Sequence, residues 1–422
     1  MNVSAHRAFS FLRTYGYERV SCSKEERTVA EALLNECTSL GVSAQLEEFT
    51  VPCGRVSHAL LRVTSPYVKE YEVTGYERAA STPEGGLDTE FLYVENADEV
   101  LLEQAKGKIV LVNGYLNRAT YEKLRKAEAA AILTFTGRTI DRESESDLNR
   151  CKLRETLTEP FGAIPVLNMR AASAAEIVRR GAKTVHIELT GECYDGTSQN
   201  VCATIPGTDK SSEVITLGGH YDSVYFSSGV HDNLSGSVIV LELLRYFAAH
   251  PPRRTLRFCW FGSEEQGLLG SKAYVKAHAD ELKACVAMLN FDVAAPTLGS
   301  NHLVTLATDD ALHYVTGVLR EAGYGVRAKQ DTYSSDCIPF ADNGVPAINL
   351  ARFGANGADY MHNRHDSLKS GYLDEHALDI TLQQGFVLLD RLANAASFPI
   401  KREIAPEIRQ KVDEYLFKAK KE

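Results

Sequence analysis

Histidine and carboxylate side chains follow a series of apolar segments in the second half of the chain. The series begins with His220, in Gly-Gly-His-Tyr-Asp-Ser, and ends with His362. Between them lie Asp232, the adjacent pair Glu264 and Glu265, and Asp292. Imidazole nitrogens and carboxylate oxygens without thiolates are typical ligands of catalytic zinc, and a carboxylate-rich set can hold two metals that share one bridging group. The series therefore predicts a metal-dependent hydrolase.

The spacing within this series suggests individual roles. His220 and Asp222 are two residues apart, so on a strand their side chains project to the same side and the carboxylate can orient the imidazole. Asp232 stands just before a helical pattern, where an Asp often serves as the helix N-cap. Because other acidic residues accompany it, we predict instead that Asp232 bridges two metal ions and gives one oxygen to each.

The adjacent residues Glu264 and Glu265 have diverging side chains, so we expect them to perform different tasks. One would bind metal, and the other would take the proton from a metal-bound water and deliver it to the leaving amine. The structural alternative is an acidic first turn of a helix, stabilised by the helix dipole. Further along the chain, either His362 or His365 could be the last metal ligand. His231, beside Asp232, is another histidine that could be mistaken for a ligand.

Four nearly continuous apolar segments predict strands that are buried on both faces of a mostly parallel sheet. They span residues 213–219, 255–261, 284–291 and 346–353. Helical apolar spacing is found at residues 235–250, 270–278 and 376–396. In open α/β sheets, functional groups gather beyond the carboxyl ends of the parallel strands. We therefore predict an α/β fold in which a mostly parallel central sheet, flanked by helices, positions the histidines and carboxylates.

The region between residues 53 and 191 has a different pattern of apolar and polar residues. It combines short alternating strands with a helical segment at residues 120–131 and a polar loop at residues 137–159, which predicts a small inserted α/β domain. The expected boundaries are 1–52 together with 192–400 for the main domain, 53–191 for the insertion and 401–422 for a C-terminal helix.

Composition narrows the class of protein. With 422 residues, of which 44% are hydrophobic, the chain can bury a large core. A formal net charge of -10 argues against a nucleic-acid partner, which needs a concentrated basic face. The nine cysteines include no Cys-x-x-Cys pair and favour reduced thiols. No apolar stretch approaches the roughly 20 residues that span a bilayer, and no signal segment is visible, so we predict no membrane partner and a cytoplasmic location.

Six sequence motifs together resemble one family of enzymes. They are GGHYDS, GVHDNLSGS, WFGSEEQGLLGS, NFDV, SDCIPFADNGVPAINL and YMHNRHDSL, within about residues 198–397. This region resembles the di-zinc aminopeptidases and glutamate carboxypeptidases, and the insertion is similar to a protease-associated domain. The resemblance implies a phosphorylase/hydrolase-like zinc-peptidase fold that holds two zinc ions.

The resemblance also implies a role for each member of the series. The implied assignment is His220 and Asp292 on one zinc, Glu265 and His362 on the other, Asp232 as the bridge, Glu264 as the general base and Asp222 as the partner of His220.

Two further expectations come from the same family pattern. The pattern places an Asp four residues after the ligating histidine, and Asp366 stands in that relation to His362, which is therefore preferred over His365. The family usually has a cis peptide bond after the bridging aspartate, here between Asp232 and Asn233.

The motifs are nearest to the aminopeptidase branch, so the expected function is removal of N-terminal amino acids from peptide substrates through a metal-activated water. The alternatives are a glutamate-type carboxypeptidase, a single-zinc glutaminyl cyclase and a non-catalytic binding module. A carboxypeptidase would need an arginine-lined pocket for the substrate carboxylate. Candidate substrate-binding residues, chosen because they lie in the loops nearest to the site, are Tyr333, Arg352 and Tyr360. Two metals per chain would favour a peptidase, one the cyclase and none the binding module.

Overall fold

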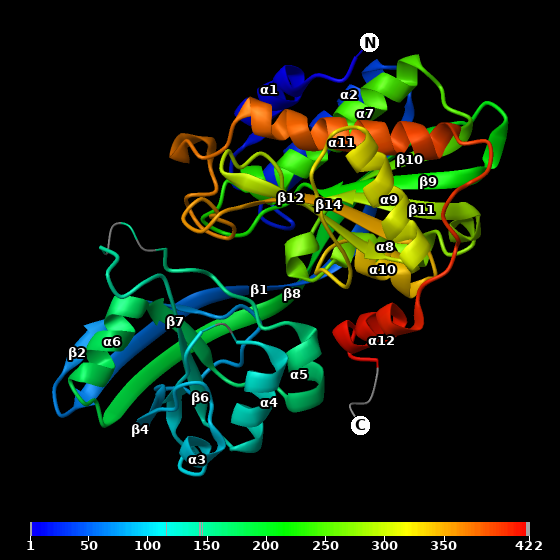
Figure 1. Ribbon diagram of the computed structural model, residues 1–422. Helices are drawn as coiled ribbons and strands as arrows, with labels where there is room; N and C mark the ends of the chain where they lie inside the picture. Colours follow the sequence, from blue (N-terminus) through cyan, green and yellow to red (C-terminus); the bar gives the residue numbers. More distant parts are fainter. Residues whose placement is uncertain (1, 115, 143–144, 146, 419–422) are drawn as a thin grey trace. The chain divides into compact units, whose positions relative to one another are not determined.

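The computed structural model describes residues 2–114, 116–142, 145 and 147–418, which form two compact units (Figure 1). The main unit consists of Met1–Val51 and Thr197–Glu422, and the inserted unit consists of Pro52–Gly196. Strand β1 (Ser43–Ser65) carries the chain out of the main unit, and strand β8 (Thr184–Ile205) brings it back. The main unit is therefore assembled from two segments that are far apart in the sequence.

The main unit contains a sheet whose central strands are parallel. Across the sheet the strands are β13 (Arg327–Gln330), β12 (Gly299–Leu306), β14 (Ala347–Gly354), β11 (Cys285–Phe291), β9 (Lys210–His220), β10 (Arg254–Phe261) and the end of β8. Strands β14, β11, β9 and β10 run parallel to one another, while β12 is antiparallel to β14 and β8 to β10. The predicted mostly parallel α/β sheet is confirmed.

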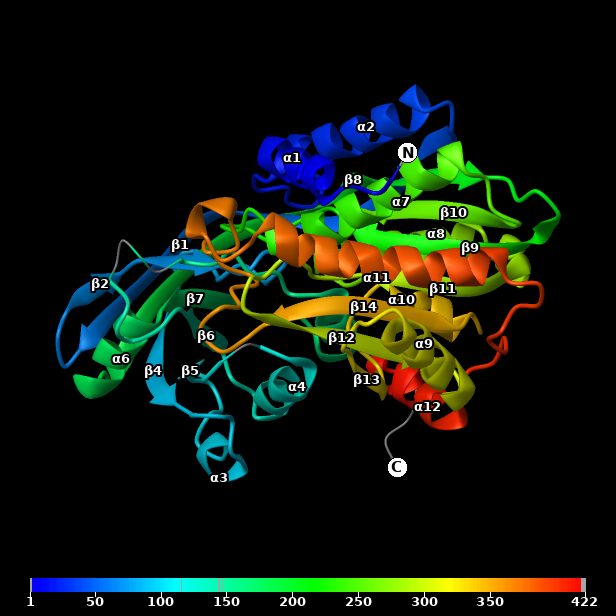
Figure 2. The ribbon, with the colours of Figure 1, turned by 45° about the horizontal axis from the view of Figure 1, so that its top comes forward.

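Helices cover both faces of this sheet (Figure 2). One face is covered by α1 (Ala5–Tyr15), α2 (Lys24–Ser39), α7 (Ser235–Ala249), α9 (Asp309–Glu321) and α11 (Glu375–Asn394). The other face is covered by α8 (Leu269–Ala277), α10 (Cys337–Asp342) and α12 (Pro406–Tyr415). Helices α7, α8 and α11 correspond to the three helical segments expected in this part of the sequence.

The apolar character of the strands follows from this two-sided cover. On β10, Phe258 and Trp260 belong to the core beneath α7, whereas Cys259 and Phe261 belong to the core beneath α8. Successive side chains of a strand point to opposite faces, so a strand covered on both faces needs an unbroken apolar run. None of the helices in the described part of the chain is long and apolar enough to span a membrane.

The inserted unit has its own α/β core. Its strands are β2 (Lys69–Tyr71), β3 (Val73–Gly75), β4 (Leu87–Tyr93), β5 (Ile109–Leu111), β6 (Ala131–Thr136) and β7 (Val166–Arg170), with helices α3 (Glu99–Leu102), α4 (Arg118–Lys126), α5 (Glu155–Phe161) and α6 (Ala171–Arg179). Strands β4, β5, β6 and β7 are parallel neighbours. Its identity as a protease-associated domain stays a prediction.

Two element boundaries differ from those expected. Helix α5 begins at Glu155, inside the stretch predicted as a loop, because Leu157 packs into the core of the inserted unit. At the C-terminus, the helix is α12 rather than residues 401–422, and residues 419–422 lie outside the described residues. Ile408 and Val412 of α12 are buried in the core beneath α8, so this helix covers the main sheet.

Candidate metal centre

The side chains singled out in the sequence meet at one edge of the main sheet. His220 is the last residue of β9, and Asp292 directly follows β11. Glu264 and Glu265 form a short 3-10 turn just after β10, and His362 lies in the loop after β14. Because these four strands are parallel, their carboxyl ends share one edge of the sheet.

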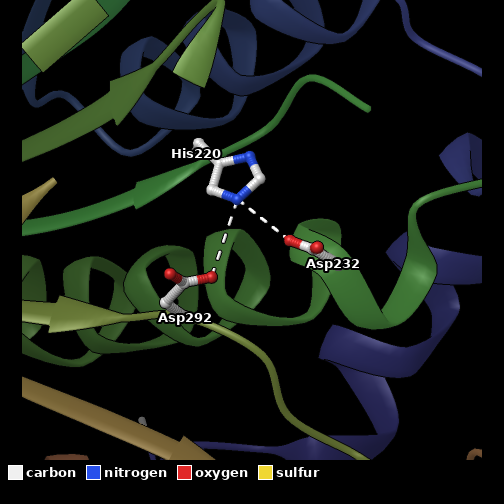
Figure 3. Close-up of side chains that lie close together, drawn as sticks. All are labelled: His220, Asp232 and Asp292. Carbon is white, nitrogen blue, oxygen red and sulfur yellow. Dashed lines mark hydrogen bonds and ion pairs between the residues drawn. The ribbon is translucent and has the colours of Figure 1, made fainter. Parts of the chain in front are cut away.

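A first group of metal-ligating atoms joins His220, Asp232 and Asp292 (Figure 3). The Nε2 atom of His220 lies 3.1 Å from Oδ1 of Asp232 and 3.6 Å from Oδ1 of Asp292. All three side chains are buried, and one ligand atom from each lies within 4.8 Å of the other two. One imidazole nitrogen with two carboxylate oxygens at this separation is a donor set that suits zinc.

A second group joins Asp232, Glu265 and His362. The Nε2 atom of His362 lies 3.0 Å from Oδ2 of Asp232 and 3.2 Å from Oε2 of Glu265. The His362 side chain is 57% exposed, so this group is open to solvent on one side. Asp232 directs one oxygen to each group, which is the arrangement expected of a bridging carboxylate.

The carboxylates of the site are crowded in a buried place, and this changes their pKa values. Burial raises the pKa of Glu264 well above its usual value, and it also raises those of Glu265 and Asp292. Burial lowers the pKa of His220, but the neighbouring carboxylates, led by Glu264, outweigh it and leave that pKa well above its usual value. Clustered buried carboxylates are stabilised by a bound cation. Both the donor atoms and their charge therefore fit a divalent metal.

Asp222 is fully buried and contacts two parts of the site. Its Oδ1 lies 3.3 Å from Nδ1 of His220 and accepts a hydrogen bond from the backbone amide of Glu264 at 3.0 Å. Its Oδ2 accepts a hydrogen bond from the backbone amide of Glu265 at 3.2 Å. The predicted neighbour of His220 therefore also holds the backbone of the acidic pair, which residue spacing alone does not indicate.

The two adjacent glutamates diverge, as expected. Glu265 joins the second group, whereas Glu264 belongs to neither of the groups found among the described residues. The Oε2 atom of Glu264 lies 3.9 Å from Nε2 of His220, so its carboxylate is beside the first group. Glu264 is therefore close to the centre without being required as a ligand.

His231 and His365 belong to neither group in the described part of the chain. The Nδ1 atom of His231 lies 2.7 Å from the carbonyl oxygen of Ala294, so this nitrogen carries a hydrogen and donates it. The ring of His365 packs against the ring of Tyr360, with 5.5 Å between their centres. Of the two rival histidines, His362 is the one that reaches the second group.

Tyr333 is a candidate substrate-binding residue whose pKa is affected by the charged side chains of both ligand groups. Burial raises the pKa of Tyr333 well above its usual value, and the negative charges of Asp292 and Asp232 raise it further. Its hydroxyl therefore keeps its hydrogen and is available as a donor.

The other two candidates have different surroundings. The guanidinium of Arg352 donates to the carbonyl oxygen of Pro296 at 3.0 Å and to the side-chain oxygen of Asn301 at 2.9 Å. The hydroxyl of Tyr360 donates to the carbonyl oxygen of Gly357 at 2.7 Å. These contacts of the Arg352 guanidinium join β14 to β12 and the loop before it.

The backbone around Asp232 contains a cis peptide bond, and two charged side chains bind the segment that leads to it. The peptide bond between Asp232 and Asn233 is cis, as the resemblance implied. Arg19 and Asp366 hold this segment, and neither was predicted as a site residue. Asp366 served only as a marker for His362, four residues before it, and no sequence signal connects Arg19 with the site.

Comparison with known proteins finds one family that resembles part of the chain. Residues 200–383 match the profile of peptidase family M28. The matched segment is therefore similar to peptidase family M28. All residues of the two ligand groups, together with Asp222 and Glu264, lie within the matched M28 segment.

Individual proteins extend the likeness beyond the M28 segment. Aminopeptidase YwaD of Bacillus subtilis (strain 168) is 26% identical over 409 residues, covering 93% of this chain and 84% of that protein. Carboxypeptidase Q of Mus musculus is 27% identical over 274 residues, covering 62% of this chain and 58% of that protein. The structure of BSAP, a zinc aminopeptidase from Bacillus subtilis, has a TM-score of 0.78 at 21% identity and covers 96% of this chain and 99% of its own. The protein described here therefore shares the fold of BSAP.

Proposed function

We propose that this protein is a member of peptidase family M28 and a zinc-dependent exopeptidase that removes N-terminal amino acids from peptides. The observation that carries the proposal is the position of Asp232, whose two oxygens face two separate groups of zinc-type ligands. A carboxylate in that position is characteristic of paired metal sites in hydrolases. The names of relatives such as aminopeptidase YwaD support the same reading.

Each ligand group would hold one zinc ion, giving two per chain. His220 and Asp292 would bind the first ion, Glu265 and His362 the second, and Asp232 both. When bound, zinc supplies a water of lowered pKa and polarises the scissile carbonyl. Asp222 would keep the imidazole of His220 oriented toward the ion while it holds the backbone that bears Glu265.

Glu264 would be the general base. Its carboxylate lies beside the first group but is not needed for ligation, so one oxygen is free to accept the proton of the attacking water. The same oxygen would then deliver the proton to the leaving amine. Tyr333 would donate a hydrogen bond to the carbonyl oxygen as negative charge develops on it, because its hydroxyl stays protonated.

The surroundings of Arg352 favour an aminopeptidase over a carboxypeptidase. A carboxypeptidase must bind the substrate carboxylate with a cationic group, and Arg352 is the arginine that the sequence offered for this task. Its guanidinium is already engaged by Pro296 and Asn301. A glutaminyl cyclase would need a single zinc, whereas the two groups of candidate ligands support a proposal of two. A non-catalytic binding module would not need Glu264.

Incubation of a mixed peptide pool with zinc-loaded protein, followed by mass spectrometry, tests this function. We expect shortening from the N-terminus, abolished by a chelator and restored by added zinc. Elemental analysis of the same sample should give two zinc ions per chain. Shortening from the C-terminus, or no metal-dependent shortening, would contradict the proposal.

A further inference from the structure

The backbone just before Asp232 is held by a carboxylate from another loop. Oδ1 of Asp366 accepts a hydrogen bond from the backbone amide of His231 at 2.7 Å, and Oδ2 accepts one from the backbone amide of Asp232 at 3.0 Å. Asp366 belongs to the same loop as His362, four residues further along the chain. One carboxylate thus ties the loop of a second-group ligand to the residue shared by both groups.

A guanidinium holds the same segment at its start. Arg19 donates to the carbonyl oxygens of Ser228 at 2.6 Å and Gly229 at 2.8 Å. Its Nε donates to the carbonyl oxygen of Tyr221, the residue after His220, at 2.6 Å. Arg19 therefore joins the end of β9, which bears a first-group ligand, to the segment that leads to Asp232.

These two contacts are complementary in charge. The guanidinium of Arg19 donates hydrogen bonds to carbonyl oxygens at the start of residues 228–232. The carboxylate of Asp366 accepts hydrogen bonds from backbone amides at the end of the same segment, so both of its ends are held. Hydrogen bonds to charged groups are stronger than those between neutral groups, by roughly a factor of two. A segment held in this way has little freedom to move its last side chain.

The side chains of Arg19 and Asp366 are both fully buried. Burial of a charged side chain has a large cost in free energy. Burial lowers the pKa of Arg19 to about 10, and the attraction of Asp366 is the largest opposing effect. Burial also raises the pKa of Asp366. Two buried ions directed at the backbone of one short segment indicate that its position matters for more than packing.

We propose that Asp366 and Arg19 are positioning residues that fix Asp232 so that each of its oxygens reaches a different zinc site. The inference rests on the proposed function in one respect, which is that Asp232 bridges two ions. Metal sites depend on the groups that orient their ligands, and loss of such a group typically lowers metal affinity by about 10–100-fold.

The test is a measurement of zinc affinity by competition with a chromophoric chelator. In Asp366→Asn, the amide nitrogen cannot accept a hydrogen bond from either backbone N–H. We expect its zinc affinity to fall at least tenfold. The matched control is Glu242→Gln, which alters a fully buried carboxylate that belongs to neither ligand group. This carboxylate accepts hydrogen bonds from the backbone amide of Ser4 at 3.0 Å and from the side chains of Arg7 and Arg245. This control should keep the affinity of the wild-type protein.

Arg19→Lys provides a second and milder variant, since lysine keeps the charge but cannot donate to several carbonyls in the same plane. Its control is Arg254→Lys, which alters another fully buried arginine that donates to backbone carbonyls, those of Leu392 and Ala395. We expect weaker zinc binding for Arg19→Lys alone. Unfolding midpoints of the zinc-free proteins report how much each substitution affects the fold itself.

The inference is overturned if neither site variant binds zinc more weakly than its control. It is also overturned if both site variants fail to fold while both controls fold, since the pair would then serve the fold as a whole. If the wild-type protein binds no zinc, the proposed function fails instead, and this result is recognised before any variant is compared.

Discussion

The carboxylate of Asp222 accepts a hydrogen bond from the backbone amide of Glu264 at 3.0 Å. The same carboxylate touches the imidazole of His220 and holds the amide of Glu265. One buried side chain therefore contacts both His220 and the turn that carries the two glutamates.

Asp222→Asn should lower activity by about 10–100-fold, the usual effect of removing a group that orients metal ligands. The amide nitrogen would face a backbone N–H where an acceptor is needed. Turnover and zinc affinity should fall together, because the substitution disturbs both the ligand and the turn. Asp209→Asn is the control, since Asp209 is an exposed partner of Arg253. Equal activity in the two variants would contradict the role of Asp222.

Glu264→Gln should keep the zinc content of the wild-type protein and lose about 10²–10⁴-fold in turnover, the range for loss of a general acid-base group. The neighbouring substitution Glu265→Gln should instead reduce the zinc content. Elemental analysis and steady-state kinetics of the two variants, measured side by side, distinguish the base from the ligand. Near-normal turnover in Glu264→Gln would remove Glu264 from the mechanism.

Removal of zinc should lower the stability of the main unit. A ligand that binds only the folded state stabilises it by about 2.7 kcal/mol when its free concentration is 100 times its Kd. Thermal unfolding of the protein with chelator and with excess zinc measures this difference. His362→Ala should retain part of the stabilisation, because the first group stays intact. Identical unfolding midpoints with and without zinc would argue against binding to the folded chain.

The stability of the main unit should also depend on pH through His278, which belongs to neither ligand group in the described part of the chain. Its Nε2 lies 2.9 Å from Glu47, and its Nδ1 lies 3.0 Å from Glu281. Burial lowers the pKa of His278, but the hydrogen bonds to Glu47 and Glu281 outweigh it and leave that pKa raised. A raised pKa in the folded state stabilises the fold fully below the unfolded value of about 6.5, and this contribution is lost as the pH rises through the folded value.

His278→Gln should therefore reduce the urea midpoint of the zinc-free protein more at pH 5.5 than at pH 9. The comparison is made on zinc-free protein so that metal binding does not contribute. A difference between variant and wild type that is the same at both pH values would show that the ion pairs do not contribute.

Gly236→Ala should be destabilising, and Gly317→Ala should not. A Cβ at Gly236, in the first turn of α7, would overlap the carbonyl oxygen of Phe291, the residue before Asp292. Overpacking of this kind costs about 1–3 kcal/mol. Gly317 in α9 has open space around an added Cβ, so alanine should stabilise the helix by roughly 0.5–1 kcal/mol. Denaturant midpoints of the pair measure the difference, and equal midpoints would contradict the close approach.

The residues of the two ligand groups could be predicted because their signal is local. His220, Asp292 and the glutamates each follow a strand whose buried character is visible as an apolar run, and parallel strands bring their carboxyl ends to one edge. The types of the residues then indicate the chemistry. The same reasoning gave helices α7, α8 and α11, whose apolar spacing is visible in the sequence.

The contacts of Arg19, Asp366 and Arg352 could not be predicted in this way. Most of them are made with backbone groups of segments that are distant in the sequence, and the type of a residue does not reveal which partner its backbone amide or carbonyl has. Arg352 lies at the loop end of a strand, where a substrate-binding arginine could stand, yet its partners are Pro296 and Asn301. Only the register of β12 against β14 decides this.

The division of the main unit into two segments has a consequence for its synthesis. Helices α1 and α2 leave the ribosome before every other element of the core they belong to, whereas the inserted unit is complete in sequence before β9 emerges. The inserted unit can therefore fold while α1 and α2 still lack α7 and the sheet. Closing the main unit requires contacts across the whole insertion, and contacts between distant residues slow folding. We expect the apolar faces of α1 and α2 to stay exposed in the nascent chain until α7 and the sheet have been synthesised.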